Sequence, residues 1–465
     1  MIDILEQIDS VVWGPIMLVI LVGTGIYLTF RTHFSSWRNL GHALALTLSK
    51  EARQTNGEGD VSPFATLCTA LAATIGTGNI AGVASALAVG GPGAMVWMWI
   101  SAAFGLTSKF TECALAIRYR VKNEKNEMLG GPMVTMERGI PEIYGESFRT
   151  FGRVLAVLFA VFAVGASFGI GNLTQGNSIA SAFNTLMDAP MWVVGVIVGI
   201  ATLIIVVGGL KSISQVSSVI VPLMAIFYFC GGVIVILMHI TAVPDAFVTM
   251  FRMAFSVKAV GGGAAGSVVA SMAQAMNKGI ARGCFSNEAG MGSAAITASA
   301  ASTDNYIKQA YINETGTFWD TFVVCSVTGL AILTSGVMDD VVVNGETVLQ
   351  GAPLTIAAFQ STLGPIGGWL VGISLALFAY STILGWEYHG EKALEYLTRS
   401  TSAALAYRII FSIIAFVGCV TAFEFAWDLS DILNALMIVP NAICMVMLIG
   451  PLYKDVRKYN EERTR

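Results

Sequence analysis

One stretch of the chain combines residue types that suit the binding of a charged ligand inside a membrane. It runs Ala-Ala-Thr-Ile-Gly-Thr-Gly-Asn-Ile-Ala-Gly over residues 72–82, at the centre of an apolar run from Phe64 to Val89. Its glycines and threonines disfavour a continuous helix, because glycine costs about 1 kcal/mol against alanine. Interrupted backbone is tolerated at membrane depth only where it is buried in protein or lines a cavity. We therefore expect a helix break here, with free N–H and carbonyl groups that form a binding site.

Two other interpretations of this stretch remain open. Residues 76–81 fit the loose dinucleotide fingerprint G-x-G-x-x-A, which needs a strand before it, a helix after it and an acidic residue about 20 positions on. The flanks are instead apolar over membrane length, and residues 97–102 contain no acid. The small residues would also allow close packing between helices.

The composition excludes a soluble protein. The chain of 465 residues is 55% hydrophobic and only 12% charged, with a mean hydropathy of +0.70, whereas an average soluble domain is about 25% charged. The seven cysteines form no C-x-x-C motif and the four histidines are scattered, so we predict neither a disulfide framework nor a metal cluster. No set of His, Cys or acidic residues converges as an enzyme would require, and nothing indicates an organic cofactor or nucleic-acid binding.

Hydropathy predicts an all-α polytopic membrane protein with 11 transmembrane helices. The expected spans are 11–30, 64–89, 94–117, 154–186, 190–209, 214–238, 265–283, 316–337, 367–388, 405–423 and 431–452. Of the 26 basic residues, only Arg252 and Lys258 lie in connections on one side of the membrane. The positive-inside rule therefore puts the N-terminus outside and the C-terminus in the cytoplasm, in a plasma or inner membrane.

The spans after the first divide into two sets of five. An odd number of spans inverts the second set relative to the first, as in many secondary transporters. This predicts an N-terminal helix with a cytoplasmic linker, a first repeat, an external connection, a second repeat and a cytoplasmic tail. Their bounds are 1–63, 64–239, 240–264, 265–452 and 453–465. We expect the first helix of each repeat to be broken, at 64–89 and at 265–283, where the second holds the polar residues of Ser271–Gly283.

Four stretches resemble the alanine or glycine:cation symporter family of the amino acid-polyamine-organocation superfamily. They are TIGTGNIAG at 74–82, QGNS at 175–178, ARGCFSNEAGMGSA at 281–294 and GWEYHGE at 385–391. The similarity extends from Val11 to Leu452. It implies a leucine-transporter-like fold of ten core helices plus one N-terminal helix. It also implies sodium-coupled uptake of small neutral amino acids (alanine, glycine, serine or D-alanine) by alternating access, for which a monomer suffices.

An amino-acid zwitterion needs donors for its carboxylate and acceptors for its ammonium group. We predict that the carboxylate binds the N–H groups of Thr77, Gly78 and Asn79. We predict that the ammonium group faces carbonyls near Thr74 and at the second break, around Gln274–Met276.

Further pocket candidates rest on spacing and on the resemblance. By resemblance Gln175 faces the substrate, although an interhelical hydrogen bond would also explain it. Phe168 and Ile179 could share a helix face with Gln175. Met276 and Trp386 complete the expected wall.

A coupling sodium ion would need oxygen ligands. The resemblance places it between the first broken helix and the eighth core helix. The ligands would be the carbonyls of Ala72, Ile75 and Phe378 and the hydroxyls of Ser381 and Thr382. These hydroxyls could instead bond back to their own helix. Residues 213–238 contain no Lys, Arg, Asp or Glu, which favours sodium over a mechanism in which a lysine replaces the ion.

Buried charges and rival functions complete the prediction. We expect Lys109 to pair with Glu112, and Arg282 to pair with Glu288 as an inner gate. Asp320 has no evident partner, so a proton relay and a hydrogen bond both stay open. The alternatives are a proton-coupled or glutamine-selective transporter of the same fold, a channel, and an amino-acid sensor that does not transport.

Overall fold

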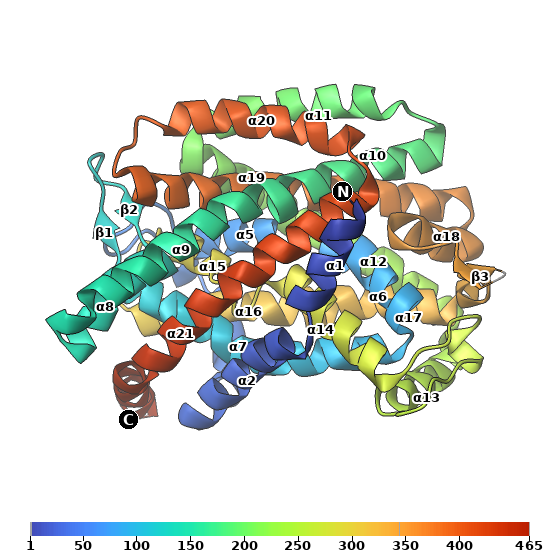
Figure 1. Cartoon of the computed structure of the whole chain (residues 1–465), viewed down its shortest axis with the longest axis horizontal. Coiled ribbons are helices and arrows are strands. Elements are labelled where there is room, and N and C mark those ends of the chain that lie inside the picture. Colours follow the sequence, from blue (N-terminus) through green and yellow to red (C-terminus); the bar gives the residue numbers. More distant parts are fainter. Residues whose placement is uncertain (1, 344, 465) are drawn as a thin grey trace.

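The structure, a computed structural model, describes residues 2–343 and 345–464. Long helices run roughly parallel to the longest axis of the molecule (Figure 1). The helical stretches that are long and apolar enough to cross a membrane are Glu146–Met187, Gly209–Met238, Tyr306–Thr334, Pro365–Thr398 and Glu424–Arg463. Shorter apolar helices are Pro15–Arg31, Pro63–Thr74, Ala81–Gly90, Met191–Val206 and Ala404–Val420. The chain is therefore a multi-pass, mostly helical membrane protein.

The regular elements follow one another with short connections. The α-helices are α1 (Ile2–Val12), α2 (Pro15–Arg31), α3 (Ser35–Arg38), α4 (Leu40–Leu48), α5 (Pro63–Thr74), α6 (Ala81–Gly90), α7 (Gly93–Tyr119), α8 (Pro132–Tyr144), α9 (Arg149–Phe168), α10 (Thr174–Met187), α11 (Met191–Val206), α12 (Gly209–Met238), α13 (Val243–Ala254), α14 (Met272–Asn287), α15 (Ser293–Ala298), α16 (Tyr306–Thr317), α17 (Ser326–Thr334), α18 (Gly351–Leu363), α19 (Pro365–Thr398), α20 (Ala404–Val420) and α21 (Phe423–Thr464). Two π-helical segments, η4 (Gly169–Leu173) and η7 (Phe318–Cys325), join α9 to α10 and α16 to α17. Two short hairpins pair β1 (Val121–Lys122) with β2 (Met128–Leu129) and β3 (Val342–Val343) with β4 (Glu346–Thr347).

The first predicted break is confirmed. Helix α5 begins at an N-cap, where Ser62 Oγ accepts from the Ala65 N–H group, and it ends at Thr74. Ile75 and Gly76 then leave the helical conformation, a 3₁₀ turn covers 77–79, and α6 starts at Ala81. The backbone therefore interrupts its helix in the middle of an apolar run, where glycine at 76 and 78 permits close approach of other groups.

The second break lies elsewhere than predicted. Helix α14 is continuous over Ser271–Gly283, and the interruption comes at 288–292, before the short helix α15. Glu288, Gly290 and Gly292 all have positive φ there (56°, 88° and 87°), a conformation that glycine adopts without steric cost. The weak hydropathy of the predicted segment reflects the polar residues in the first half of α14 and not a break.

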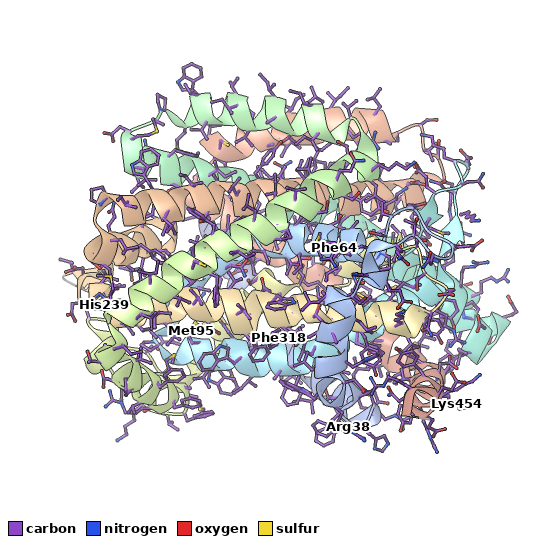
Figure 2. All side chains as sticks on the ribbon, turned by 180° about the vertical axis from the view of Figure 1, so that it is seen from behind. Arg38, Phe64, Met95, His239, Phe318 and Lys454 are labelled. Carbon is purple, nitrogen blue, oxygen red and sulfur yellow. The ribbon has the colours of Figure 1, made fainter. Side chains whose placement is uncertain are left out.

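Charged residues gather at one end of the long helices. Lys454 lies at one end and His239 at the other, and Arg38 lies between them on the side nearer Lys454 (Figure 2). The first end also carries α8, both strands of the β1–β2 hairpin and the C-terminus, whereas α13, α18 and β3 mark the opposite end (Figure 1).

The sides of the molecule between these ends are apolar. Large aliphatic side chains on α9, α11 and α12 are exposed there, among them Val154 (52%), Ile204 (72%) and Val219 (67%). Apolar side chains that a soluble protein would bury instead face outward, which is the pattern expected of helices in lipid.

Candidate functional site

The backbone N–H groups of the first break are held by neutral side chains. Asn79 Oδ1 accepts from the Gly76 N–H group at 2.9 Å, and Gln175 Oε1 accepts from the Thr77 N–H group at 3.1 Å. Gly78 packs directly on Ser286 of α14. All of these groups are buried, and an amide oxygen offers a backbone donor the same contact as a carboxylate oxygen. Of the predicted carboxylate donors, the Thr77 N–H group thus meets an amide oxygen, whereas the Asn79 N–H group donates to the Gly76 carbonyl within the 3₁₀ turn.

Gln175 is brought to this break by the π-helical segment η4. Its Nε2 atom donates to the carbonyl of Ile170 at 2.7 Å, which points its Oε1 atom at Thr77. A Cβ atom added to Gly76 would collide with Thr382 Oγ1 and lie 3.0 Å from Gln175 Oε1. The break, η4 and α19 thus meet with no space for a side chain at residue 76.

The five predicted cation ligands converge beside the break. Thr382 Oγ1 lies 2.9 Å from the Ala72 carbonyl oxygen, 3.4 Å from that of Ile75 and 3.1 Å from that of Phe378. Ser381 Oγ lies 3.4 Å from the Ala72 oxygen and 2.9 Å from the Phe378 oxygen. The hydroxyls therefore contact both their own helix, α19, and the end of α5. An uncharged cluster of five oxygens in a buried position suits a monovalent hard cation.

Thr74 closes α5 immediately before the break. It is buried, and its hydroxyl donates to the carbonyl of Ala70. Carbonyl groups in the last turn of a helix lack intrahelical partners. The carbonyls near Thr74 are therefore placed to accept hydrogen bonds, as the prediction for the ammonium group requires.

Asp320, an acidic residue not included in the predicted site, contacts the first break through hydrogen bonds. The Asp320 carboxylate, in η7, accepts from Asn79 Nδ2 (2.5 Å), Ser286 Oγ (3.0 Å) and Thr321 Oγ1 (2.8 Å). Within the described parts of the chain, no basic group forms an ion pair with it. The hydrogen-bonding alternative for Asp320 is therefore the one observed. The sequence signal that could have placed Asp320 in the site is that it is a single acidic residue inside an apolar span.

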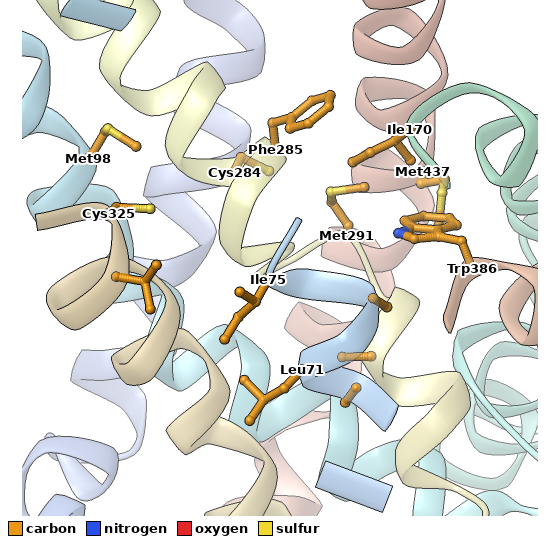
Figure 3. Close-up of a cluster of buried hydrophobic side chains, with 14 of the residues drawn as sticks. Leu71, Ile75, Met98, Ile170, Cys284, Phe285, Met291, Cys325, Trp386 and Met437 are labelled. Carbon is orange, nitrogen blue, oxygen red and sulfur yellow. The ribbon is translucent and has the colours of Figure 1, made fainter. Parts of the chain in front are cut away.

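Trp386, which was predicted to form part of the pocket wall, contacts the second break. It is fully buried, and its Nε1 atom donates to Glu288 Oε1 at 2.6 Å. Figure 3 shows Ile75 between Cys325 on one side and Met291 and Trp386 on the other. The two breaks are thus neighbours across a common hydrophobic core.

Gln274 and Met276 do not lie at either break. Gln274 caps the start of α14, where its Oε1 atom accepts from the Ser271 N–H group at 2.9 Å. Its carbonyl lies near Gly90, at the far end of α6. Since Ser286 is the α14 residue that contacts Gly78, Gln274 lies about 18 Å away along the helix. The prediction that carbonyls of Gln274–Met276 face the ammonium group is therefore wrong.

Phe168 and Ile179 pack in a different hydrophobic cluster from Ile75 and Trp386. The Phe168 ring contacts those of Tyr407 and Phe411 on α20, with ring centroids 5.5 and 5.8 Å apart. A role for Phe168 and Ile179 as pocket walls stays a prediction.

The predicted ion pair between Arg282 and Glu288 is wrong. Arg282 pairs instead with Asp431 of α21, with an N–O distance of 2.7 Å, and its guanidinium group lies over the Trp427 ring. Glu288 accepts from Trp386 and Ser293. Arg282 lies within α14, whereas Glu288 follows the last residue of that helix with a positive φ of 56°. The two side chains therefore contact different partners and do not meet.

Asp9 of the N-terminal helix α1 lies beside this ion pair. Burial, followed by the nearby charge of Asp431, raises the pKa of Asp9 to about 7 from its ordinary value of 3.8. Trp13 Nε1 also donates to the Asp431 carbonyl, so α1 is attached to the first turns of α21.

Lys109 and Glu112 do not form the predicted ion pair. Glu112 Oε2 accepts from the Gly292 N–H group (3.0 Å) and from Asn441 Nδ2 (2.9 Å), which also donates to the Gly290 carbonyl. Lys109 is buried, and among the described residues its Nζ atom has no hydrogen-bond partner. Glu112 therefore binds the second break and not the lysine one turn away.

Comparison with known proteins decides the family. Residues 1–465 match the sodium:alanine symporter family model. The chain belongs to the sodium:alanine symporter family. It is 44% identical over 462 residues to the sodium/alanine symporter AgcS of Methanococcus maripaludis, covering 99% of this chain and 98% of that protein. It is 34% identical to a probable sodium/glutamine symporter, GlnT, of Bacillus subtilis, covering 99% and 92%.

A solved structure agrees with the fold. A manganese transporter of Eremococcus coleocola matches with a TM-score of 0.50 at 14% identity, covering 86% of this chain and 80% of that one. Members of the sodium:alanine symporter family are transporters and not enzymes. The resemblance inferred from residues 74–82 and 281–294 is confirmed.

Proposed function

We propose that this protein imports small neutral amino acids together with sodium, by alternating access. Alanine and glycine are the first candidate substrates, followed by serine and D-alanine. The observation that carries the proposal is the convergence of five oxygens, from α5 and α19, directly beside a break whose N–H groups point at exchangeable amide oxygens.

Coupling follows from this geometry. A sodium ion at Ala72, Ile75 and Thr382 would fix the end of α5 and so define the conformation of the break. The substrate carboxylate would replace Asn79 Oδ1 at the Gly76 N–H group and Gln175 Oε1 at the Thr77 N–H group. Ion and substrate would then each favour the binding of the other.

The crowding at Gly76 supports a small substrate. Thr382 and Gln175 both approach the position of its absent Cβ atom. Relatives nevertheless include a probable glutamine symporter, so glutamine belongs in the test as the main competitor.

We further propose 11 spans with the N-terminus outside and the C-terminus in the cytoplasm. The crossings would be α2, α5–α6, α7, α9–α10, α11, α12, α14–α15, α16–α17, α19, α20 and α21. The spans after α2 would form two inverted sets of five, each opened by a broken helix. The position of Lys454, α8 and the C-terminus at one end supports this orientation.

Uptake by purified protein in proteoliposomes tests the function. Labelled alanine, glycine and glutamine would be supplied with an inward gradient of sodium, potassium or choline. We expect sodium-dependent uptake of alanine and glycine and little of glutamine. Sodium-independent uptake that follows a pH gradient would contradict the proposed coupling.

A substitution locates the ion. Thr382→Ala removes the hydroxyl that contacts three carbonyl oxygens, and we expect the half-saturating sodium concentration to rise about tenfold or more. Thr398→Ala, which removes an exposed hydroxyl at the far end of the same helix, is the matched control. Equal sodium dependence in both variants would show that the ion binds elsewhere.

A further inference from the structure

A charged cleft lies at the end of the molecule that carries the C-terminus. It has a volume of about 780 Å³ and is bounded by α8, the start of α9 and the end of α7. Four arginines and three glutamates line it. Neither the transport site nor the breaks extend to it, so it needs a separate explanation.

Each glutamate of the cleft already has an arginine partner. Glu146 pairs with Arg149 at 2.6 Å, Glu137 with Arg399 at 2.7 Å, and Glu142 with Arg118 at 3.7 Å. The acidic side of the cleft is therefore neutralised by the chain itself.

Two arginines of the cleft are left over. Arg138 of α8 and Arg153 of α9 are exposed, and among the residues described neither forms an ion pair or a side-chain hydrogen bond. Both line the same cleft. A guanidinium group presents a planar set of donors that matches phosphate oxygens, so the free charge favours a phosphate-bearing ligand.

The surroundings place this cleft at the level of lipid headgroups. A membrane-length apolar stretch begins at Glu146. Tyr144, Phe148 and Phe151 form a chain of aromatic rings, with centroid separations of 5.6 and 6.4 Å, and they are 44%, 40% and 42% exposed. Exposed aromatic rings at a helix end are typical of the membrane–water interface. Along α9 the exposed side chains then become aliphatic, as at Val154 and Val161.

We propose that this cleft binds the headgroup phosphate of an anionic phospholipid, with Arg138 and Arg153 as its ligands. The acyl chains would lie along the exposed aliphatic face of α9. A soluble phosphate compound would contact the arginines but not the exposed apolar side chains beside them. A phospholipid would contact both, through its headgroup and its acyl chains. Basic pockets between helices at the cytoplasmic surface are suited to such headgroups. The choice of leaflet rests on the orientation given under the proposed function.

The cleft is also connected to the cation ligands. Arg399, which follows α19, forms two hydrogen bonds of 2.7 and 2.8 Å with Glu137 of α8. Helix α19 carries Ser381 and Thr382. A lipid that fixes α8 would thus restrain the inner end of the helix that binds sodium.

Direct binding to the purified full-length protein tests the proposal. Short-chain phosphatidylglycerol, phosphatidylcholine of the same chain length and inorganic phosphate would each be titrated by microscale thermophoresis in detergent. We expect saturable binding of phosphatidylglycerol only. The double variant Arg138→Gln/Arg153→Gln should weaken it about 10- to 30-fold. Arg252→Gln, which changes an exposed arginine of α13 at the opposite end, is the matched control.

Each result decides the proposal. Equal affinity for phosphatidylcholine, or unchanged affinity in the double variant, would overturn it. Binding of inorganic phosphate as tight as that of the lipid would assign the site to a soluble anion and overturn the lipid claim. A monodisperse elution profile checks that the double variant is folded. No uptake is measured in this experiment. Failure of the proposed transport function would therefore not change the lipid-binding result, and failure of lipid binding would not change the uptake result.

Discussion

The two breaks are stabilised by different kinds of group. In the first, neutral oxygens of Asn79 and Gln175 accept from backbone N–H groups, and the carboxylate of Asp320 contacts the break through the side chain of Asn79. In the second, carboxylates act directly, since Glu112 accepts from Gly292 and Glu288 accepts from Trp386. A neutral amide can yield its donor to an incoming carboxylate at small cost, whereas a buried carboxylate that is displaced loses a charge-assisted hydrogen bond. The first break is thus suited to exchange ligands and the second to stay assembled.

Among the substitutions that test this comparison, Gly76→Ala should have the largest effect on transport. The added methyl group would collide with Thr382 Oγ1 and crowd Gln175, which displaces the cation ligands and the break together. We expect sodium-driven alanine uptake to fall about 100-fold, because small displacements of a binding site carry large costs. Gly82→Ala is the control: it lies one turn away in α6, and its nearest neighbours would be 3.8 and 3.9 Å from the new atom. Comparable losses in both variants would mean that the first break has no special role.

Asp320→Asn tests the hydrogen bonds between the Asp320 carboxylate and the first break. The substitution replaces one acceptor oxygen by a donor that faces Asn79, Ser286 or Thr321. We expect the KM for alanine to rise about 10- to 30-fold, as for the loss of a buried hydrogen bond to a charged group. The exposed Asp339 supplies the control variant Asp339→Asn. A normal KM in Asp320→Asn would separate this residue from substrate binding.

How far the sequence predicted the molecule depends on the kind of signal. The first break was found because glycine and threonine violate helix preference within residues 74–78, and the five cation ligands were transferred by family resemblance. The second break was misplaced because low hydropathy marks a polar helix face as readily as an interruption. The spacing of Gly290 and Gly292 was the better signal.

The charge partners could not be found from sequence distance. Glu112 is one turn from Lys109, but a backbone N–H group from residue 292 competes for it. Arg282 finds Asp431, which is 149 positions away along the chain. Such choices are decided by the packing of helices that are remote in sequence.

Glu112→Gln should have a moderate effect that falls on stability. The amide keeps one acceptor for Gly292 or Asn441 but loses its charge, so the second break is held less firmly. We expect the thermal midpoint of the purified protein to drop by roughly 3–6 °C. The KM for alanine should stay within about twofold of the unchanged protein, since the proposed substrate site is at the first break. The exposed Glu346 provides Glu346→Gln as the control. A higher KM for alanine with an unchanged thermal midpoint would show that the second break takes part in substrate binding, contrary to this prediction.

Asp9→Asn should have the smallest effect, which falls on folding stability and is greatest above about pH 7. The folded protein keeps the Asp9 proton up to a pKa of about 7, whereas the unfolded chain releases it near 3.8. Folding stability is therefore lost as the pH rises from about 4 to about 7. The asparagine does not titrate, so it should raise the thermal midpoint more at pH 8 than at pH 5. Asp340→Asn controls for the loss of an exposed charge; a gain that is equal at both pH values would contradict the assignment.

The π-helical segments η4 and η7 have a consequence for how the family can vary. A π-turn contains one residue more than an α-turn, and the extra residue rotates everything beyond it by about 100°. In η4 this lets Gln175 reach back five residues to the Ile170 carbonyl, and after η7 Ser326 does the same to Thr321. Deleting a single residue would restore a plain helix and turn the amide of Gln175 away from Thr77. The number of residues in each of these two helices therefore matters as much to the first break as the identity of Gln175 itself.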